Sequence, residues 1–540
     1  MQIKYLSISN FRGIKQLEWK LDGNLICLIG PGDSTKTTIL DAIEYVMSSR
    51  FLRIYDTDFY NCDVNHSIEI TATIGQLPPK ITALDSFGYQ LRGWTPEGEL
   101  RDEPQEGDEH VLTIKLTVDK TLEPQWSVVN DRVPDGVSIS SGFRESIGVC
   151  RISDNVNFEL GWARGSTLAQ GIHTRSAMPI LAEVGRKARS AFLEDSVDEL
   201  VESAKSATEA AKDFGVIPGS SDYAPGLDAA AISSRAGAIT LYDGCIPIRQ
   251  FGLGTRRLVA TAIQRSAIDG KAILLLDEIE HGLEPYRLRY LLRMLQAEME
   301  RGSFGQVIMT THSPTAVVEL CCDSLRVVRK TGECTIVQSV DSDLQSTVRA
   351  CPESLLSRKV IVCEGKTEYG LLRGIEDTWA KEHESLRLSH LGVALQDGNG
   401  HEAPKHAKHL RSLGYDVALF ADSDEETSKS DDCALQELGV SIIRWSDELS
   451  TEQRICLDVP ENVLQEMVLM ILDSEEWNVF FDKIAANLKC NRCSMTNDIS
   501  TWLTNGVSIS DLRLSLGAVA KKNKWFKRID YGEWLGSTIV

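Results

Sequence analysis

Leu25–Leu40 reads LICLIGPGDSTKTTIL, and this stretch decides the fold of the first two-thirds of the chain. Its apolar start suits a buried strand, its glycine-rich middle suits a loop, and the residues after Lys36 have the apolar period of a helix. A strand, a loop and a helix in this order surround a phosphate with backbone N–H groups and the positive end of a helix. The sequence therefore predicts a phosphate-binding loop, lined by Gly30, Gly32, Thr35, Lys36, Thr37 and Thr38.

The spacing from Gly30 to Lys36 and Thr37 matches the Walker A pattern of nucleotide-binding proteins, with one departure. In that pattern Lys36 reaches the terminal phosphates of ATP, and the Thr37 hydroxyl binds Mg²⁺. The departure is Thr35, which stands where the pattern has glycine. A β-branched residue is strained at positive φ and crowds such a loop, so this match needs support from elsewhere in the chain.

The composition limits the class of protein. The 540 residues suffice for two or more domains, and 42% hydrophobic with 25% charged residues is ordinary for a soluble globular chain. No apolar run approaches the length that spans a membrane, and the N-terminus lacks the form of a signal peptide. The 13 cysteines are scattered, which predicts reduced core residues rather than a disulfide framework. We expect a cytoplasmic protein without a membrane partner.

The net charge of −21 argues against a protein that wraps nucleic acid through bulk electrostatics. The same charge is compatible with local basic grooves. It is also compatible with a metal-dependent nuclease, because the clustered carboxylates of such an enzyme are neutralised by the cations that they bind.

The pattern of the chain up to about residue 150 is mainly that of strands. Met1–Ile8 and Gln16–Trp19 predict a hairpin that leads into the phosphate-loop strand, and His66–Gly75 and Val111–Val118 predict further strands of a β lobe. The period then becomes helical over Ala188–Lys212, within an inserted region of about residues 150–240. This helical segment would contribute a dimer contact or cover the sheet, with a plain surface helix as the alternative.

A second apolar run supports the nucleotide site. Lys271–Glu278 reads KAILLLDE, which is the form of a Walker B strand that ends in two acids. Asp277 would hold Mg²⁺, and Glu278 would polarise the attacking water.

Two further pieces of a nucleotide site flank that strand in the sequence. Gly305–Thr311 is another apolar run, and it is followed by His312, which could contact the γ-phosphate. Before the acids, Phe251–Leu258 reads FGLGTRRL, a glycine-bearing turn that opens a helix and has Gly254 as its candidate nucleotide contact. Taken singly, each piece could be an ordinary core feature, but their joint occurrence by chance is improbable.

The order of these pieces resembles that of an ABC-type ATPase head. The turn departs from the pattern at Gly252, where many such heads have serine. Together with Thr35, this departure predicts weak ATP turnover with nucleotide binding retained. In ABC-type heads the signature turn completes the site of a second subunit, so the resemblance implies a homodimer or a higher homo-oligomer.

A second group of acids follows residue 350. Arg358–Cys363 and Tyr415–Ala421 are two apolar strand patterns, and acids come directly after each of them. Because the carboxyl ends of parallel strands meet at one edge of a sheet, these acids should converge. Carboxylates packed together are costly unless divalent cations bind them. The predicted cation ligands are Glu364, Glu368, Asp422 and Asp424.

The order of a strand with EGKTE and a strand with DSD resembles the Toprim domain of topoisomerases, primases and certain nucleases. With the preceding ABC-type head, nearly the whole chain resembles the OLD (overcoming lysogenisation defect) family of ATP-dependent nucleases. The resemblance implies an α/β fold in which an ABC-type ATPase head (residues 1–345), with its inserted β lobe and helical dimerisation segment, precedes a parallel-sheet Toprim nuclease domain (residues 355–540).

Two later stretches match that family as well. Ser450–Arg454 supplies Glu452 where OLD nucleases have a further metal-binding carboxylate. Lys521–Lys527 reads KKNKWFK and resembles their C-terminal lysine motif. By resemblance Lys524 would stabilise charge on the scissile phosphate, and the two aromatic residues after it would fix its backbone. The alternatives for this lysine are Lys521, Lys522 and Lys527.

The function that these features predict is hydrolysis of DNA phosphodiesters by two Mg²⁺ or Mn²⁺ ions roughly 4 Å apart. Glu364, Asp422 and Asp424 would be the chief ligands, with Glu368 and Glu452 completing the coordination. The ATPase head would regulate or position the nuclease. By resemblance, the protein would act in anti-phage defence, with a partner protein or a reverse-transcribed DNA in some systems.

Three other classes share parts of this pattern. A RecF-like or SMC-like DNA-binding ATPase would have the head, but it has no need of the acids after residue 358. A topoisomerase or a primase would have the Toprim domain, but it also needs domains that have no counterpart here. A regulator without nuclease activity would bind ATP and gate a partner protein.

Overall fold

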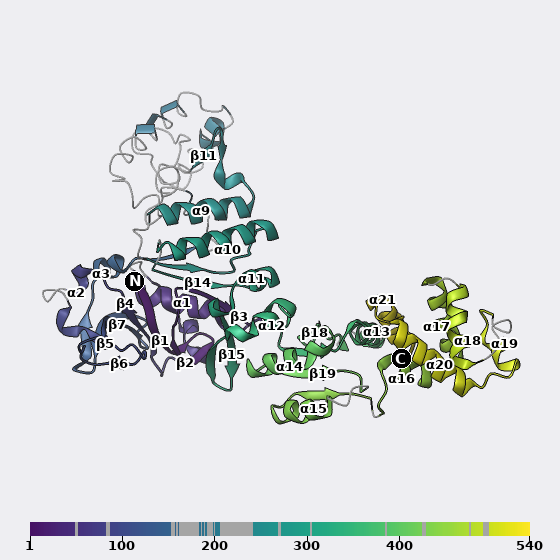
Figure 1. The fold of residues 1–540 in the computed structure, drawn as a ribbon. Helices are drawn as coiled ribbons and strands as arrows, with labels where there is room; N and C mark the ends of the chain where they lie inside the picture. Colours follow the sequence, from purple (N-terminus) through teal and green to yellow (C-terminus); the bar gives the residue numbers. More distant parts are fainter. Residues whose placement is uncertain are drawn as a thin grey trace. The chain divides into compact units, whose positions relative to one another are not determined.

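The computed structural model describes residues 1–48, 52–82, 87–152, 241–267, 272–302, 305–383, 386–423, 428–445, 447–474, 477–489 and 496–539, with scattered positions between 157 and 205 (Figure 1). The helix expected at residues 188–212 lies mostly outside them. The chain forms two compact units, Met1–Leu25 with Thr37–Thr310, and Ile26–Lys36 with Thr311–Val540. No helix in these described segments has the length and apolarity of a membrane span.

The first unit contains an antiparallel β lobe. Its strands run in the order β2-β1-β4-β7-β5-β6, and β8 and β9 continue from β7. The bounds are β1 (Gln2–Phe11), β2 (Ile14–Lys20), β4 (Ile68–Gly75), β5 (Arg92–Trp94), β6 (Leu100–Arg101), β7 (Glu109–Val118), β8 (Pro124–Asn130) and β9 (Val133–Ser138). The predicted hairpin of the first two strands and the predicted strands β4 and β7 are confirmed. Alternate apolar residues of β1, such as Leu6 and Ile8, are fully buried.

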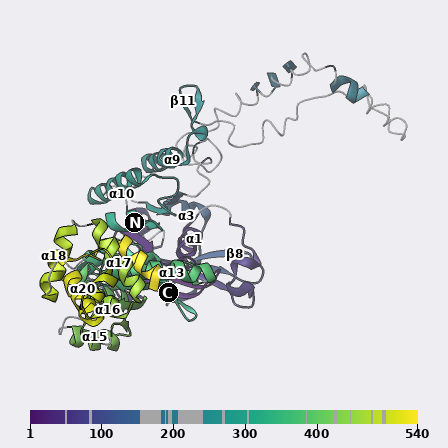
Figure 2. The ribbon, with the colours of Figure 1, turned by 90° about the vertical axis from the view of Figure 1, so that its right-hand side faces the viewer.

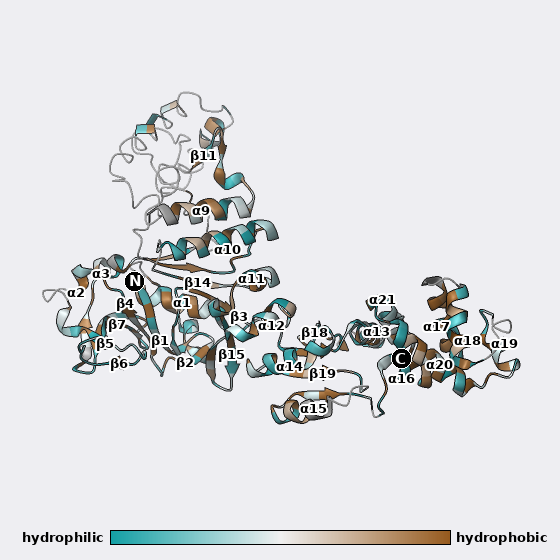
Figure 3. Cartoon of the chain, viewed as in Figure 1, coloured by the Kyte–Doolittle hydropathy of each residue, from teal (hydrophilic) through white to brown (hydrophobic). Residues whose placement is uncertain are grey.

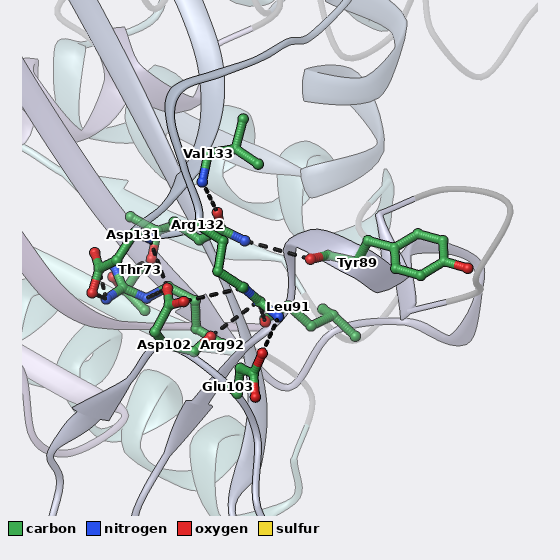
Figure 4. Close-up of polar contacts among 11 residues, drawn as sticks. Thr73, Tyr89, Leu91, Arg92, Asp102, Glu103, Asp131, Arg132 and Val133 are labelled. Atoms are coloured by element: carbon green, nitrogen blue, oxygen red, sulfur yellow. Dashed lines mark hydrogen bonds and ion pairs between the residues drawn. The ribbon is translucent and has the colours of Figure 1, made fainter.

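An ion-pair network fixes the outer edge of this lobe, and Figure 4 shows it. Arg132 pairs with Asp102 at 3.1 Å and with Glu103 at 3.3 Å. Arg92, whose side chain is only 11% exposed, reaches Asp131 at 3.2 Å. The main chain N–H of Asp131 also donates to Asp102, at 2.7 Å. The network therefore joins the β6 segment to the turn between β8 and β9.

The same unit contains the parallel strands β10 (Val149–Ile152), β13 (Ile273–Leu276) and β14 (Gln306–Thr310), which lie in that order. All four residues of β13 are buried, as a strand between two parallel neighbours requires. The helices and short strands of this part are α1 (Lys36–Met47), α2 (Pro79–Thr82), α3 (Ser141–Ile147), β11 (Tyr242–Asp243), β12 (Ile246–Pro247), α9 (Leu253–Ala267) and α10 (Pro285–Glu300).

The second unit holds the phosphate-loop strand and a separate parallel sheet. β3 (Leu25–Ile29) pairs in parallel with β15 (Leu325–Thr331), which pairs with β16 (Cys334–Ser339). The separate sheet has four parallel strands in the order β18-β17-β19-β20. Its strands and the neighbouring helices are α11 (Pro314–Glu319), α12 (Gln345–Ala350), β17 (Lys359–Cys363), α13 (Lys366–Glu382), β18 (Val393–Asp397), α14 (Ala403–Ser412), β19 (Asp416–Phe420), α15 (Ser428–Glu437) and β20 (Ser441–Ile443).

A helical bundle completes the second unit (Figure 2). Figure 3 shows hydrophobic faces on α17, α18 and α20, and the shared core of the bundle includes Phe480, Trp502 and Phe526. These three side chains are fully buried. The helices are α16 (Thr451–Asp458), α17 (Glu461–Ser474), α18 (Trp477–Leu488), α19 (Ile499–Thr504), α20 (Ile509–Asn523) and α21 (Ile529–Ile539).

Two pairs of glycines let α21 lie directly on α13, where Figure 1 shows the two helices side by side. The pairs have equal spacing, Gly370 with Gly374 on α13 and Gly532 with Gly536 on α21. A Cβ at Gly374 would lie 2.0 Å from the carbonyl oxygen of Glu533, and one at Gly536 would lie 2.1 Å from that of Leu371. The two backbones are therefore in contact, and only glycine fits at the crossing.

We predict that Gly374→Ala destabilises the fold by about 1–3 kcal/mol, because the added methyl group must push the two helices apart. Gly142→Ala on α3 is the matched control, since a Cβ there meets no atom closer than 3.9 Å. The control should be neutral or slightly stabilising, because alanine favours a helix over glycine. Calorimetric unfolding in the presence of a chelator measures both. Equal midpoints for Gly374→Ala and wild type would contradict the prediction.

Two histidines of α14 share one hydroxyl group of α12. Thr347 Oγ1 lies 2.9 Å from Nδ1 of His406 and 2.8 Å from Nδ1 of His409. Burial lowers the pKa of both imidazoles. The pKa of each imidazole is lower in the folded chain than in the unfolded one. The contribution of the two neutral imidazoles to the free energy of unfolding is therefore complete above the ordinary histidine pKa, and it is lost as pH falls through the folded-state pKa.

We therefore expect the unfolding temperature to fall between about pH 8 and pH 5, the range in which histidine titrates. The fall should be shallower in His406→Gln, which removes one of the two imidazoles. His401→Gln is the control, because His401 is exposed. Thermal unfolding across this pH range tests the slope, and an identical slope in His406→Gln and wild type would rule this explanation out.

Candidate functional site

The phosphate loop has the backbone that its sequence predicts. Gly30 has φ +135°, and a Cβ there would lie 2.5 Å from the carbonyl oxygen of Val328, so glycine is required. Thr35 has φ +71° and Asp33 has φ +59°, which places both in the left-handed region. The expected strain at Thr35 is therefore present. Gly32 faces open space, with no atom within 4 Å of a built Cβ.

The Walker A lysine is held inside its own loop. Lys36 Nζ donates to the carbonyl oxygens of Gly30 at 3.1 Å and Pro31 at 2.8 Å, and to Ser34 Oγ at 3.1 Å. The residue is only 4% exposed. The ammonium group is thus fixed among the loop atoms, where a phosphate oxygen would be a further acceptor.

Asp277 of the Walker B pair lies beside the Thr37 hydroxyl, as the motif requires. Thr37 Oγ1 is 3.2 Å from Asp277 Oδ1, and Thr310 Oγ1 donates to the same oxygen at 2.7 Å. Glu278 is exposed, has φ +44°, and its N–H donates to Thr310 Oγ1 at 2.8 Å. The sequence predicted the Mg²⁺-binding pair Thr37 and Asp277, and the structure brings these two residues together. His312 is exposed and Thr38 is half-buried.

Two arginines that sequence reasoning missed also contact Asp277. Arg151 on β10 is 2.8 Å from its carboxylate and 2.9 Å from that of Glu44, and also pairs with Asp41. Burial lowers the pKa of Arg151, but the three carboxylates raise it by more, so the net shift is upward. Arg257 on α9 donates to the main chain oxygen of Asp277. No spacing signal in the sequence marks either arginine.

Gly254 in the signature-like turn has a packing role. A Cβ there would lie 2.3 Å from the carbonyl oxygen of Gly282, which belongs to the turn after the Walker B acids. The absence of a side chain therefore lets the first turn of α9 lie against that turn. Gly252 faces open space.

We predict that Thr35→Gly improves nucleotide binding and turnover. Glycine has no penalty at positive φ, so the change relieves about 1–2 kcal/mol of backbone strain, and it restores the Walker A residue. Titration with ATP and a phosphate-release assay measure the effect. Lys36→Ala is the control and should abolish both. Unchanged binding and turnover in Thr35→Gly would show that the strain has no functional cost.

The parallel sheet of the second unit brings Glu364 and Asp422 together. Cys363 at the end of β17 is in register with Asp397 of β18 and Phe420 of β19. The acids therefore leave the sheet at one edge, and the N–H of Asp422 donates to Glu364 Oε2 at 2.9 Å. The predicted convergence of these two residues is present. Asp424 lies outside the described residues.

Glu368 and Glu452 lie in the same neighbourhood. Glu368 is 6% exposed and Glu452 is 3% exposed. Burial raises the pKa of Glu368, and hydrogen bonds from Thr451 and the main chain lower it. The carboxylates of Glu364 and Glu452 are close enough to raise it further. Buried acids that repel one another suit a bound cation, and oxygen donors of this kind suit Mg²⁺ or Mn²⁺.

The donor set is not arranged around a single point. In the part of the chain that the structure describes, no three His, Cys, Asp or Glu residues form a group that could hold a metal ion as they stand. The residues present fit Mg²⁺ or Mn²⁺ by their chemistry, since all of the candidate donors are carboxylates.

The lysine segment lies beside the start of α13. Thr367 Oγ1 donates to the carbonyl oxygen of Phe526 at 3.0 Å, and Thr367 directly precedes Glu368. Trp525 and Phe526 are buried, whereas Lys524 is exposed with φ +56° at the end of α20. The two aromatic residues therefore fix the backbone that carries Lys524. The alternatives Lys521, Lys522 and Lys527 are also exposed.

Sequence reasoning missed a further acid at this edge. Asp397 ends β18 directly opposite Cys363, and its Oδ1 accepts from the N–H of Asn399 at 3.0 Å. The turn that follows donates from Gly400 N to the carbonyl oxygen of Glu364, at 2.6 Å. The signal was a strand pattern that ends in an acid, at Val393–Asp397, but its polar Gln396 obscured it.

Comparison with protein families gives three matches along the chain. Residues 1–110 match the AAA ATPase domain, and residues 156–319 match the AAA domain of the AbiEii, Type IV TA system group. Residues 355–424 match the TOPRIM domain described as overcoming lysogenization defect protein-like. A search of curated proteins finds no match.

Several solved structures are similar to the chain at a distant level. The SmcHead bound to the C-winged helix domain of ScpA is 13% identical, covers 64% of this chain and all of its own (100%), and has a TM-score of 0.35. The SMC head domain from Thermotoga maritima is 13% identical over 63% of this chain and 100% of its own, with a TM-score of 0.30. The recombination mediator protein RecF-ATP of the RecFOR pathway is 12% identical over 62% of this chain and 97% of its own, with a TM-score of 0.33.

The matches and the fold define the class of this protein. It joins an ATPase region with a large mixed sheet to a Toprim domain with a parallel sheet. This combination of domains is similar to the ATPase-plus-Toprim architecture of the OLD family. The combination supports an ATP-dependent, nuclease-like function that uses a nucleotide and divalent metal ions.

Proposed function

We propose that this protein is an ATP-binding, metal-dependent DNA endonuclease that nicks DNA or cleaves both strands. The observation that carries the proposal is the 2.9 Å hydrogen bond from Asp422 N to Glu364 Oε2, which joins the ends of two neighbouring strands. Buried Glu368 and Glu452 lie beside this pair. Such a concentration of carboxylates has no structural benefit without cations, and phosphodiester cleavage is the chemistry that a pair of cations supports.

In this proposal Glu364, Asp422 and Asp424 are the chief ligands of Mg²⁺ or Mn²⁺, and Glu368 and Glu452 complete the coordination. When bound, two such ions supply a hydroxide nucleophile and stabilise the leaving oxygen. The chain itself contributes Lys524, whose charge would stabilise the scissile phosphate. Its position depends on Trp525 and Phe526, which are anchored through Thr367.

The ATPase region would bind ATP with Mg²⁺ through Gly30, Gly32, Thr35, Lys36, Thr37, Thr38 and Asp277. Glu278 would polarise the attacking water, and His312 would contact the γ-phosphate. Gly254 would complete the site of a second subunit, which makes the active form a homodimer or a higher homo-oligomer. We place the ATPase within residues 1–345 and the nuclease within residues 355–540, and we propose a role in anti-phage defence, with a partner protein or a reverse-transcribed DNA.

We predict that Asp422→Ala and Glu364→Ala each lower plasmid cleavage by more than about 100-fold, since loss of a ligand should exceed the effect of losing a supporting residue. Asp416→Ala is the matched control. Asp416 begins β19, the strand that leads to Asp422, and its side chain is exposed and pairs with Arg411. The assay follows supercoiled and linear DNA with Mg²⁺ or Mn²⁺, with and without ATP.

Lys36→Ala, measured in parallel, separates the nucleotide contribution from cleavage. If Asp422→Ala cleaves as well as wild type, the nuclease proposal is wrong. If purified wild type turns over ATP but never cuts DNA, the protein is an ATPase of the RecF or SMC kind or a nucleotide-gated regulator.

A further inference from the structure

Trp445 contacts two of the chain segments that carry the acids. It follows β20 by two residues and lies at the same edge of the parallel sheet as Glu364. Its main chain oxygen accepts from Ser423 Oγ at 2.7 Å, and Ser423 directly follows Asp422. Its indole Nε1 donates to Thr451 Oγ1 at 3.1 Å, and Thr451 directly precedes Glu452. Trp445 therefore joins two segments that are far apart in the sequence.

The hydrogen bonds from Trp445 have a fixed direction. An indole N–H can only donate, so Thr451 Oγ1 must accept from it. The single hydroxyl proton of Thr451 is then available to donate, and the side chain of Glu368 is hydrogen-bonded to this hydroxyl. The chain of donors thus runs from Trp445 through Thr451 to a carboxylate that is 6% exposed.

The position of Trp445 is itself fixed from two sides. Its ring lies edge to face on Phe420, with 5.8 Å between the centroids and 75° between the planes. The preceding residue, Arg444, pairs with both carboxylate oxygens of Asp432, at 2.7 Å and 2.9 Å, and donates to the main chain oxygen of Asp422. Rigid neighbours of this kind preorganise the donor that Trp445 supplies.

We propose that Trp445 is a positioning residue for the divalent cation site, acting through Thr451 on Glu368 and through Ser423 on Asp422. The inference rests on the proposed function, because it assigns the groups that orient the same ligands. In this role Trp445 orients the ligands and is not itself a ligand of the cation. Its removal leaves every carboxylate in place but frees the Thr451 hydroxyl, so affinity for the cation should fall while the chemistry at saturating cation is largely retained.

The test compares Trp445→Phe, Thr451→Val and the double variant with wild type. Binding of Mn²⁺ to the full chain is followed by electron paramagnetic resonance, which needs no cleavage, and plasmid cleavage is titrated against Mn²⁺. Each single variant should bind Mn²⁺ about 10-fold more weakly. The double variant should be no weaker than either single variant, because both changes break the same chain of hydrogen bonds.

Two controls distinguish positioning from general damage. Thr451→Ser retains the hydroxyl and should bind Mn²⁺ as tightly as wild type does. Thr451→Val alters the same position but lacks the hydroxyl, so it should bind Mn²⁺ more weakly. Trp379→Phe removes an indole from α13 that is 45% exposed, and it should change nothing. If Trp445→Phe does not fold, the pair of Thr451 variants still decides the matter.

The outcomes separate this inference from the proposed function. If wild type binds Mn²⁺ and cleaves DNA but the Trp445 and Thr451 variants match it, the positioning role is wrong and the nuclease stands. If losses in the double variant add, the two residues act separately and the inference fails. If wild type neither binds Mn²⁺ nor cuts DNA, the proposed function fails, and the positioning role falls with it.

Discussion

Mutual repulsion of carboxylates is the constraint that shapes the Toprim part of this protein. The parallel register of β17 and β19 places Glu364 and Asp422 at one edge of the sheet. Glu368 and Glu452 are buried in the same neighbourhood. Several donors hold these acids: the main chain N–H of Asp422 donates to Glu364, the main chain N–H of Gly365 donates to Glu368, and the Thr451 hydroxyl is hydrogen-bonded to Glu368. Such dipoles orient carboxylates without cancelling their charge. The donors around Glu364 and Glu368 therefore fix the orientation of these carboxylates.

The C-terminal bundle serves the same edge of the sheet through backbone contact. Because glycines let α21 lie directly on α13, the segment just before α21 is held at the start of α13, close to Glu368. That segment contains Trp525 and Phe526, whose burial in the bundle core leaves Lys524 at the surface. The crossing of the two helices thus helps to fix the backbone position of Lys524.

The sequence predicted the features that are encoded locally. Apolar runs that end in acids predicted β13 with Asp277, β17 with Glu364 and β19 with Asp422. The parallel register of β17 and β19 then places Glu364 and Asp422 at one edge of the sheet. Family resemblance added Glu452 and Lys524. The residues that support the sites were not predictable in this way, because Arg151, Arg444 and Trp445 act on partners that follow no fixed spacing. The paired glycines show the same limit: the spacing of Gly370 and Gly374 is visible, but their partner helix is more than a hundred residues away.

The phosphate loop packs with the later part of the chain. The loop belongs to the unit that contains the Toprim sheet, and Gly30 approaches the backbone of Val328 on β15. The next residue, Arg329, lies 5.9 Å above the ring of Tyr415, and β16 contributes a hydrogen bond of 3.1 Å from Gln338 Nε2 to the carbonyl oxygen of Ser412. Tyr415 directly precedes β19, the strand that leads to Asp422. Backbone and side-chain contacts therefore run without a break from the loop to an acid of the proposed nuclease. Thr35, whose φ of +71° lies in the left-handed region, belongs to the same loop.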